Sequence, residues 1–150
     1  MEPFRRPEVA AYAALLAESF HRLLGRPLCE DGSAQGLWTL QQPLVSHGTE
    51  ADPVFRYGNA AALALWDMDW DAFTRLPSRQ SAADTSEVQA DRARLLETAR
   101  QRGWVPGYTG IRISARGRRF RISDVILWTV TDAAGTCHGQ AALIGRVEDI

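Results

Sequence analysis

The sequence contains no lysine: all 17 basic residues are arginine, and their charge is balanced by that of 18 acidic residues. The absence of lysine excludes Schiff-base and lysine-nucleophile chemistry. A net charge of −1 also gives no overall field that would attract nucleic acid or an anionic membrane surface. We therefore expect neither nucleic acid nor a membrane as a partner.

Cysteine and long apolar runs are also scarce. Cys29 and Cys137 form neither a disulfide framework nor CxxC pairs for zinc, so we expect reduced thiols. No stretch of about 18 apolar residues is present, and the start MEPFRRPEV lacks the apolar segment of a secretory leader. These features favour a soluble, cytoplasmic protein, and 150 residues suit one domain.

The most informative stretch is ADPVFRYGNAAALALW, residues 51–66. Its first half suits a half-buried strand, and its second half is a run of helix-forming residues. Asn59 stands between them, where an Asn side chain can accept a hydrogen bond from the first helical turn. Gly58 is expected to let the backbone reverse there. The stretch therefore predicts a strand, a capped corner and a helix.

The periodicity of the remaining chain predicts one antiparallel sheet with helices over it, which is an α+β fold. Residues 1–36 read as an N-terminal amphipathic helix, ending near Gly25, and a polar connector, and residues 37–150 as the main domain. Within the domain we expect strands at residues 37–47, 54–57, 104–114, 118–132 and 137–147, a short helix after Asp69, and a long helix at residues 83–102.

Several segments, in this order, carry a family resemblance. SHGTEADPVFRYGN, ALWDMDWDAFTRLPSR and GIRISARGRRFRISDVILW resemble the MEKHLA domain, and the chain over residues 37–147 resembles the broader PAS fold to which that domain is related. The resemblance implies a five-stranded sheet in the spatial order 2-1-5-4-3, with helices closing a ligand cavity on its inner face. It is closest to the stand-alone bacterial members of the family.

The MEKHLA family is also found at the C-terminus of plant class III homeodomain leucine-zipper factors, where it is regarded as a sensory or regulatory module. This chain has neither a homeodomain nor leucine-zipper heptads, so DNA binding does not carry over. The resemblance implies a noncatalytic regulatory module that binds an unidentified small molecule or regulatory protein.

The sequence identifies no cofactor. PAS relatives that form a flavin adduct carry a cysteine in an NCRF-like motif, and the corresponding segment here, LPSRQSAADTSE, has none. Haem-binding relatives use a histidine on the long helix, whereas residues 83–102 contain no histidine. These departures disfavour an adduct-forming flavin and a haem of that type, and they leave noncovalent flavin open.

Aromatic residues and one acidic residue are our candidates for lining the cavity. Asp124 interrupts an alternation that places Phe120, Ile122, Ile126, Trp128 and Val130 on one face, so in a regular strand it would point inward and pair with Arg79 or Arg112. The alternative is a β-bulge that turns Asp124 outward, or a structural salt bridge. The predicted ligand-binding set is Trp66, Phe73, Arg79, Tyr108, Ile113, Phe120, Asp124 and Trp128.

Two other kinds of site were weighed. His47, His138 and Cys137 lie on strands that are neighbours in a PAS sheet, but such lone residues more often pack or face solvent than bind metal, so no metal is assigned. The alternative function is a small cone-shaped α+β enzyme, with Asp124 and His47 or His138 as an acid/base pair. That fold would need its long helices before most of the sheet.

Two surfaces remain. Arg116, Arg118, Arg119 and Arg121 cluster at a hairpin, where they are better explained as a solvated face than as a phosphate site. The apolar face of the N-terminal helix, which includes Leu16, either pairs with a second copy to form a homodimer or caps the sheet of the same chain.

Overall fold

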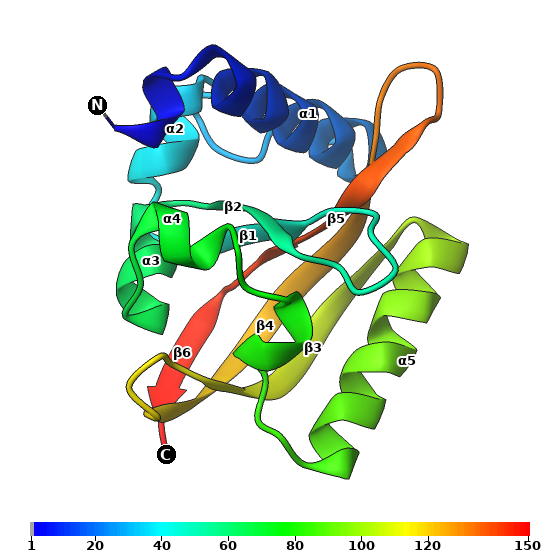
Figure 1. Ribbon diagram of the computed structural model, residues 1–150. Coiled ribbons are helices and arrows are strands. Elements are labelled where there is room, and N and C mark those ends of the chain that lie inside the picture. The colour runs from blue at the N-terminus through cyan, green and yellow to red at the C-terminus, as the bar shows by residue number, and fades with distance from the viewer. Residues whose placement is uncertain (1) are drawn as a thin grey trace.

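The structure is a computed structural model that describes residues 2–150. Six strands form one antiparallel sheet in which β2, β1, β5, β4 and β3 lie side by side in that order, as expected (Figure 1). β6 pairs with β4 beyond the end of β5, where the sequence predicted a single strand over residues 137–147. The strands are β1 Leu44–His47, β2 Phe55–Gly58, β3 Trp104–Ile113, β4 Arg119–Thr131, β5 Cys137–Leu143 and β6 Arg146–Asp149.

Helices cover both faces of this sheet. Figure 1 shows α1 across the top of the molecule and α5 along its right-hand side. In residues 2–150 no helix combines the length and the apolar character that crossing a bilayer requires. The helical elements are η1 Pro3–Arg5, α1 Pro7–Leu24, α2 Ala34–Thr39, α3 Ala60–Trp66, α4 Trp70–Phe73, η2 Ser78–Ser81 and α5 Ser86–Arg102.

The short helix α2 occupies part of a segment for which the sequence predicted a strand. Ser33 caps this helix, because its Oγ accepts a hydrogen bond from the amide of Gly36 at 3.0 Å. Leu37 and Trp38 are buried next to each other, which does not fit the alternation of a half-exposed strand. The prediction of a strand over residues 37–47 is therefore wrong for its first half.

The predicted corner between β2 and α3 is present, and Asn59 is fully buried within it. Its Oδ1 accepts hydrogen bonds from the amides of Ala62 and Leu44, both at 3.0 Å. Its Nδ2 donates to the carbonyls of Gln42 at 3.0 Å and Leu37 at 3.2 Å. One side chain thus caps α3 and also ties that helix to β1 and to the segment after α2.

Gly58 serves packing at this corner rather than backbone reversal. It is not among the glycines with positive φ. A Cβ at Gly58 would lie 2.6 Å from the ring of Phe73, which is closer than any carbon contact tolerates. The glycine therefore leaves space for an aromatic side chain from α4, and the role expected from the sequence is corrected.

An extra residue in β4 turns Asp124 outward. Tyr108 of β3 pairs with Val125 of β4, and Gly110 of β3 pairs with Ile122 of β4. Two residues along β3 therefore correspond to three residues along β4. Asp124 is the additional residue of this bulge. Its backbone is left-handed, with φ 53°, and its side chain is exposed. The bulge alternative is thus the observed one, and the inward-pointing Asp124 is not.

The bulge also changes which residues of β4 share a face. Phe120 and Ile122 precede it and lie in the inner-face core with Val125. Trp128 and Val130 follow it and lie in the outer-face core with α1. The sequence prediction placed all of them except Val125 on one face, because it assumed uninterrupted alternation, and a one-residue insertion reverses that alternation.

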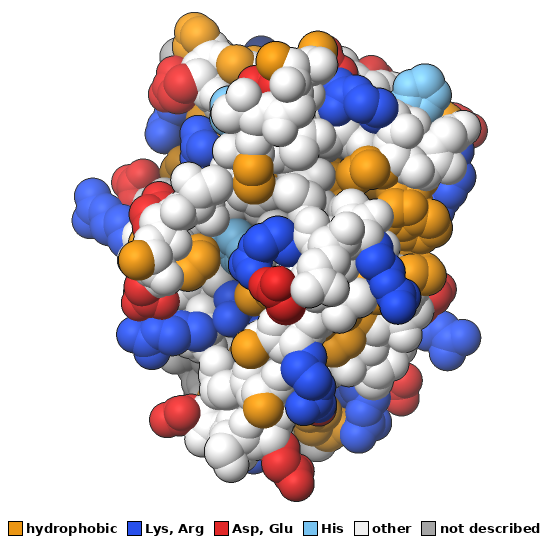
Figure 2. All heavy atoms as spheres, turned by 90° about the vertical axis from the view of Figure 1, so that its right-hand side faces the viewer, with side chains coloured by type: hydrophobic (Ala, Val, Ile, Leu, Met, Phe, Trp, Pro, Cys, Tyr) orange, Lys and Arg blue, Asp and Glu red, His pale blue; other side chains and the backbone are white. Residues whose placement is uncertain are grey.

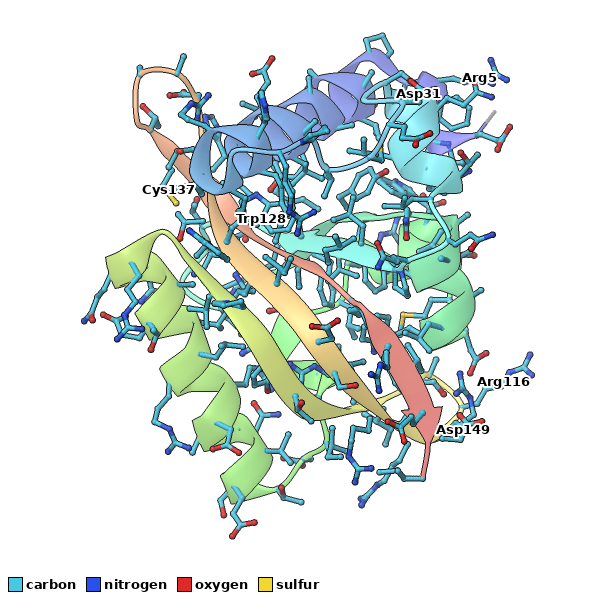
Figure 3. The ribbon with its side chains drawn as sticks, turned by 180° about the vertical axis from the view of Figure 1, so that it is seen from behind. Arg5, Asp31, Arg116, Trp128, Cys137 and Asp149 are labelled. Carbon is cyan, nitrogen blue, oxygen red and sulfur yellow. The ribbon has the colours of Figure 1, made fainter. Side chains whose placement is uncertain are left out.

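The N-terminal helix packs on the sheet of its own chain. Leu16 and Phe20 are fully buried, and the ring of Phe20 meets that of Trp128 edge-on at 5.0 Å. Trp128 Nε1 donates to Ser19 Oγ at 3.0 Å, and Figure 3 shows Trp128 below α1. Intramolecular capping therefore covers the apolar face on which a homodimer through α1 would depend.

We expect Asn59→Ala to lower the free energy of unfolding by about 2–4 kcal/mol, because it removes a cap and leaves several buried backbone groups without partners. Thr85→Ala is the control, since Thr85 caps α5 with one exposed hydrogen bond, 3.2 Å to Val88 N, and should cost about 1 kcal/mol. Urea unfolding of both variants measures the difference. Equal costs would contradict a linking role for Asn59.

Candidate functional site

A cavity of about 60 Å³ lies between the inner face of the sheet, η2 and α5. A single water needs roughly 10–15 Å³ by this measure, so the cavity holds several waters or a small molecule. Most of its wall is apolar, as is usual for ligand sites. The apolar lining is Val45, Phe55, Trp66, Leu95, Leu96, Ile122, Val125, Leu127, Ala141, Ala142 and Ile144.

Polar side chains gather on one part of this wall. His47 Nδ1 lies 2.9 Å from Ser78 Oγ, and Arg92 donates to the same hydroxyl. Arg112 stacks over the ring of Tyr108, with its guanidinium carbon 5.5 Å from the ring centre. All five residues line the cavity. They come from β1, η2, α5 and β3, so the fold brings them together from distant parts of the sequence.

β3 makes room for this polar wall by carrying a glycine between its two polar residues. Tyr108, Gly110 and Arg112 alternate along the strand and so project from one face. A Cβ at Gly110 would lie 2.4 Å from Tyr108 Oη and 2.9 Å from Arg112 Nη1. The absence of a side chain at Gly110 therefore lets the phenol and the guanidinium approach each other.

The cavity wall carries positive charge without a matching carboxylate. Arg112 is 8% exposed, and burial together with the charge of Arg112 lowers the pKa of Arg92 to about 10. Among residues 2–150 no ion pair includes either arginine. The nearby Asp52 pairs instead with Arg79, at 3.1 Å. Figure 2 views the molecule from the side of α5 and shows arginine, histidine and acidic side chains close together near the centre of that surface.

α5 covers the cavity but belongs to neither hydrophobic core. Of its residues only Ala99 is fully buried, and both core clusters lie elsewhere. Its C-terminal half is held by hydrogen bonds: Gln140 Nε2 donates to Leu96 O at 2.9 Å, and Thr129 Oγ1 donates to Ala99 O at 3.1 Å. The cavity lies beside the middle of the helix, where Arg92, Leu95 and Leu96 form part of its wall.

Two of the predicted ligand-binding residues line the cavity, and two lie behind it. Trp66 and Tyr108 form part of the wall. Phe73 and Phe120 pack against Trp66 at ring distances of 6.0 and 5.4 Å, within the inner-face core. They support the wall without facing the cavity.

The other four predicted residues lie away from the cavity. Arg79 is about half exposed and paired with Asp52. Asp124 is exposed at the bulge, and Trp128 lies on the outer face for the reason given above. Ile113 is half-buried and neighbours Arg112 in β3, so it projects from the opposite face.

The sequence analysis missed Ser78 and Arg92 and considered Arg112 only as a partner for Asp124. A signal for Arg92 was present, because Arg92, Leu95, Leu96 and Ala99 follow the i, i+3, i+4, i+7 spacing of one helix face. That spacing predicts an arginine facing the sheet. Ser78, in a short 3₁₀ turn, carried no comparable signal.

The residues considered for metal binding or acid/base chemistry do not meet. His47 contacts Ser78 in the cavity, whereas His138 contacts Asp132 in the β4–β5 hairpin at 2.9 Å, and Asp124 is exposed elsewhere. In the part of the chain that the structure describes, no group of three or more His, Cys, Asp or Glu side chains is placed to hold a metal ion. Neither proposed Asp124–His pair is formed.

Solved structures with the same arrangement are PAS and light-oxygen-voltage (LOV) domains. A PAS domain from Colwellia psychrerythraea superposes with a TM-score of 0.63 at 9% identity, over 78% of this chain and 92% of that one. A fungal LOV domain photoreceptor gives 0.61 at 15% identity, over 91% and 96%. A PAS domain from a two-component sensor histidine kinase gives 0.58 at 15% identity, over 75% and 89%. The fold is thus that of the PAS-type sensory domains.

The sequence places the chain more narrowly. The MEKHLA domain matches residues 10–148, so the protein belongs to the MEKHLA domain family. The match begins inside α1 and therefore includes the N-terminal helix, which the resemblance seen in the sequence did not. No curated protein matches the chain.

His47 predicts a pH dependence of stability. Burial, reinforced by Arg92, lowers the pKa of His47 to about 4, whereas an unfolded histidine titrates near 6.5. As pH falls from 6.5 to 4 the unfolded chain takes up this proton and the folded chain does not, so stability decreases, by about 3 kcal/mol for this group. Urea unfolding at several pH values should show this loss.

The variant His47→Asn separates this contribution from that of other titrating groups. It keeps a polar atom near Ser78 but cannot titrate in this range. Its free energy of unfolding should fall less than that of the original protein between pH 6.5 and 4. Parallel curves for the two proteins would show that the burial of His47 does not control this loss.

Proposed function

We propose that the protein is a noncatalytic sensory module whose cavity binds a small molecule, and that occupancy changes how α5 packs on the sheet. The observation that carries this proposal is the position of the cavity beneath a helix that belongs to neither core. A ligand there would add contacts between Leu95 and Leu96 on α5 and the strands below. It would therefore favour the docked position of α5 over less tightly packed ones.

A hydrogen-bond chain offers a route from the cavity to the opposite face. Gln140 in β5 donates through its side chain to Leu96 of α5, and its backbone carbonyl accepts from Ser46 Oγ at 2.8 Å. Ser46 Oγ in turn lies 2.8 Å from Tyr12 Oη on α1. A shift of α5 would thus change the hydrogen bonds that reach α1. A partner protein that contacts either helix would respond to that shift.

The resemblance to other PAS-type domains supports a sensory role without identifying the signal. One similar structure is that of an RNA-binding LOV receptor, and another is the light-state dimer of a fungal blue-light photoreceptor. In residues 2–150 the cavity lining includes no cysteine, so adduct formation of the kind considered above has no thiol in the wall. A noncovalent ligand is the form of binding that we propose.

Native mass spectrometry of the protein purified without added cofactor tests for such a ligand. We expect a noncovalent mass adduct in the original protein and its loss in Ala142→Leu, because Ala142 lines the cavity and a larger side chain would fill it. A clean mass for the original protein would favour a module that binds a partner protein instead.

The same substitution predicts a difference in stability between the cavity and the outer-face core. Ala142→Leu places three more carbon atoms into the cavity, so we expect its midpoint of thermal unfolding to be unchanged or raised. Ala13→Leu is the control, because Ala13 is 2% exposed in the outer-face core and does not line the cavity, so overpacking there costs about 1–3 kcal/mol. Equal losses in both variants would mean that the space beside Ala142 cannot accept atoms.

A further inference from the structure

The polar wall of the cavity has the chemistry of an anion site, and we infer that the ligand is a small organic carboxylate whose short apolar body lies against the sheet. Arg92 and Arg112 would hold the carboxylate. This inference rests on the proposed function, because it concerns the same cavity and specifies what enters it.

The first argument is the unbalanced charge of the two arginines. A buried cation costs free energy unless an anion or several acceptors compensate it. Arg112 donates to the carbonyl of Ile111 at 3.0 Å and lies 3.4 Å from Tyr108 Oη, and both of these acceptors are neutral. Arg92 donates to Ser78 Oγ, which is also neutral. A bound carboxylate would supply the negative charge that this wall lacks.

The second argument is that the nearby carboxylates among residues 2–150 form no ion pair with either arginine, although the charge of Asp52 acts on Arg92 from a distance. Asp52 is engaged by Arg79, and Glu50 accepts from the amide of Val54 at 3.2 Å. Each guanidinium has five N–H donors, so both arginines keep donors for a ligand after their present hydrogen bonds are counted. Arginine donors match the two oxygens of a carboxylate in spacing and direction.

The third argument concerns the rest of the ligand. The surface beyond the arginines is apolar and includes Ile122, Val125 and Leu127. A free inorganic anion would leave this surface without a partner, whereas a short hydrocarbon chain would contact it. The volume of about 60 Å³ sets a limit of a few carbon atoms unless α5 moves outward.

Calorimetric titration of the full chain tests the inference with butyrate, its neutral analogue butyramide, and inorganic phosphate. We expect butyrate to bind at least tenfold more tightly than butyramide, since a charge-assisted hydrogen bond is worth about one to two factors of ten in affinity. Arg92→Gln and Arg112→Gln should each abolish that preference. Arg94→Gln is the matched control, because Arg94 is exposed on the same helix and paired with Asp91.

The binding comparison requires that the variants fold, so their thermal unfolding is measured as well. That measurement is also a second test of the inference. Replacing one of two adjacent uncompensated cations relieves repulsion, so Arg112→Gln without ligand should unfold at the same temperature as the original protein or above it. A lower midpoint together with an unchanged preference for butyrate would overturn the inference. Equal affinities for butyrate and butyramide would do the same.

The remaining outcomes separate this inference from the proposed function. Tighter binding of phosphate than of butyrate would overturn the organic carboxylate and leave an anion-sensing cavity. Binding of butyramide without a preference for butyrate would overturn the anion site and leave a small-molecule module. Failure of all three probes to bind would overturn the carboxylate, and the native mass adduct would then decide the proposed function alone.

Discussion

The cavity depends on one extra residue in β4, the longest strand of the sheet. Because Asp124 forms a bulge, Val125 and Leu127 face inward and Trp128 faces α1. In an uninterrupted strand the large indole of Trp128 would project into the inner side of the sheet, where the cavity now lies. The same bulge falls where pairing of β4 passes from β5 to β6, so it also decides how the C-terminal strand is attached.

Three features of the fold could be read from the sequence, two of them from local chemistry and the third from the family resemblance. The capped corner at Asn59, the end of the long helix at Arg102 and the strand order implied by the family resemblance all agree with the structure. The helix α2 and the outward turn of Asp124 were not predicted outright. In both cases the local sequence pattern is compatible with two structures. Burial of Leu37 in the outer-face core favours the helix α2, and the pairing of β4 with β3 requires the bulge at Asp124.

The site was harder to predict than the fold, for a physical reason. The aromatic candidates were chosen by size, and size alone does not tell a cavity wall such as Trp66 from the layer behind it, such as Phe120. The residues that give the cavity its chemical character are arginines, which in a sequence are usually taken as solvated. Only the convergence of α5 and β3 places Arg92 and Arg112 together, and convergence is a property of the folded chain.

The two long helices are attached to the sheet by different forces. α1 shares a hydrophobic core with the sheet through Leu16 and Phe20, so releasing it exposes a large apolar area. α5 contributes no residue to either core, and its contacts include hydrogen bonds with Gln140, Thr129 and Ser78. Burial of apolar surface thus holds α1 on the sheet, whereas directed polar contacts fix much of the position of α5.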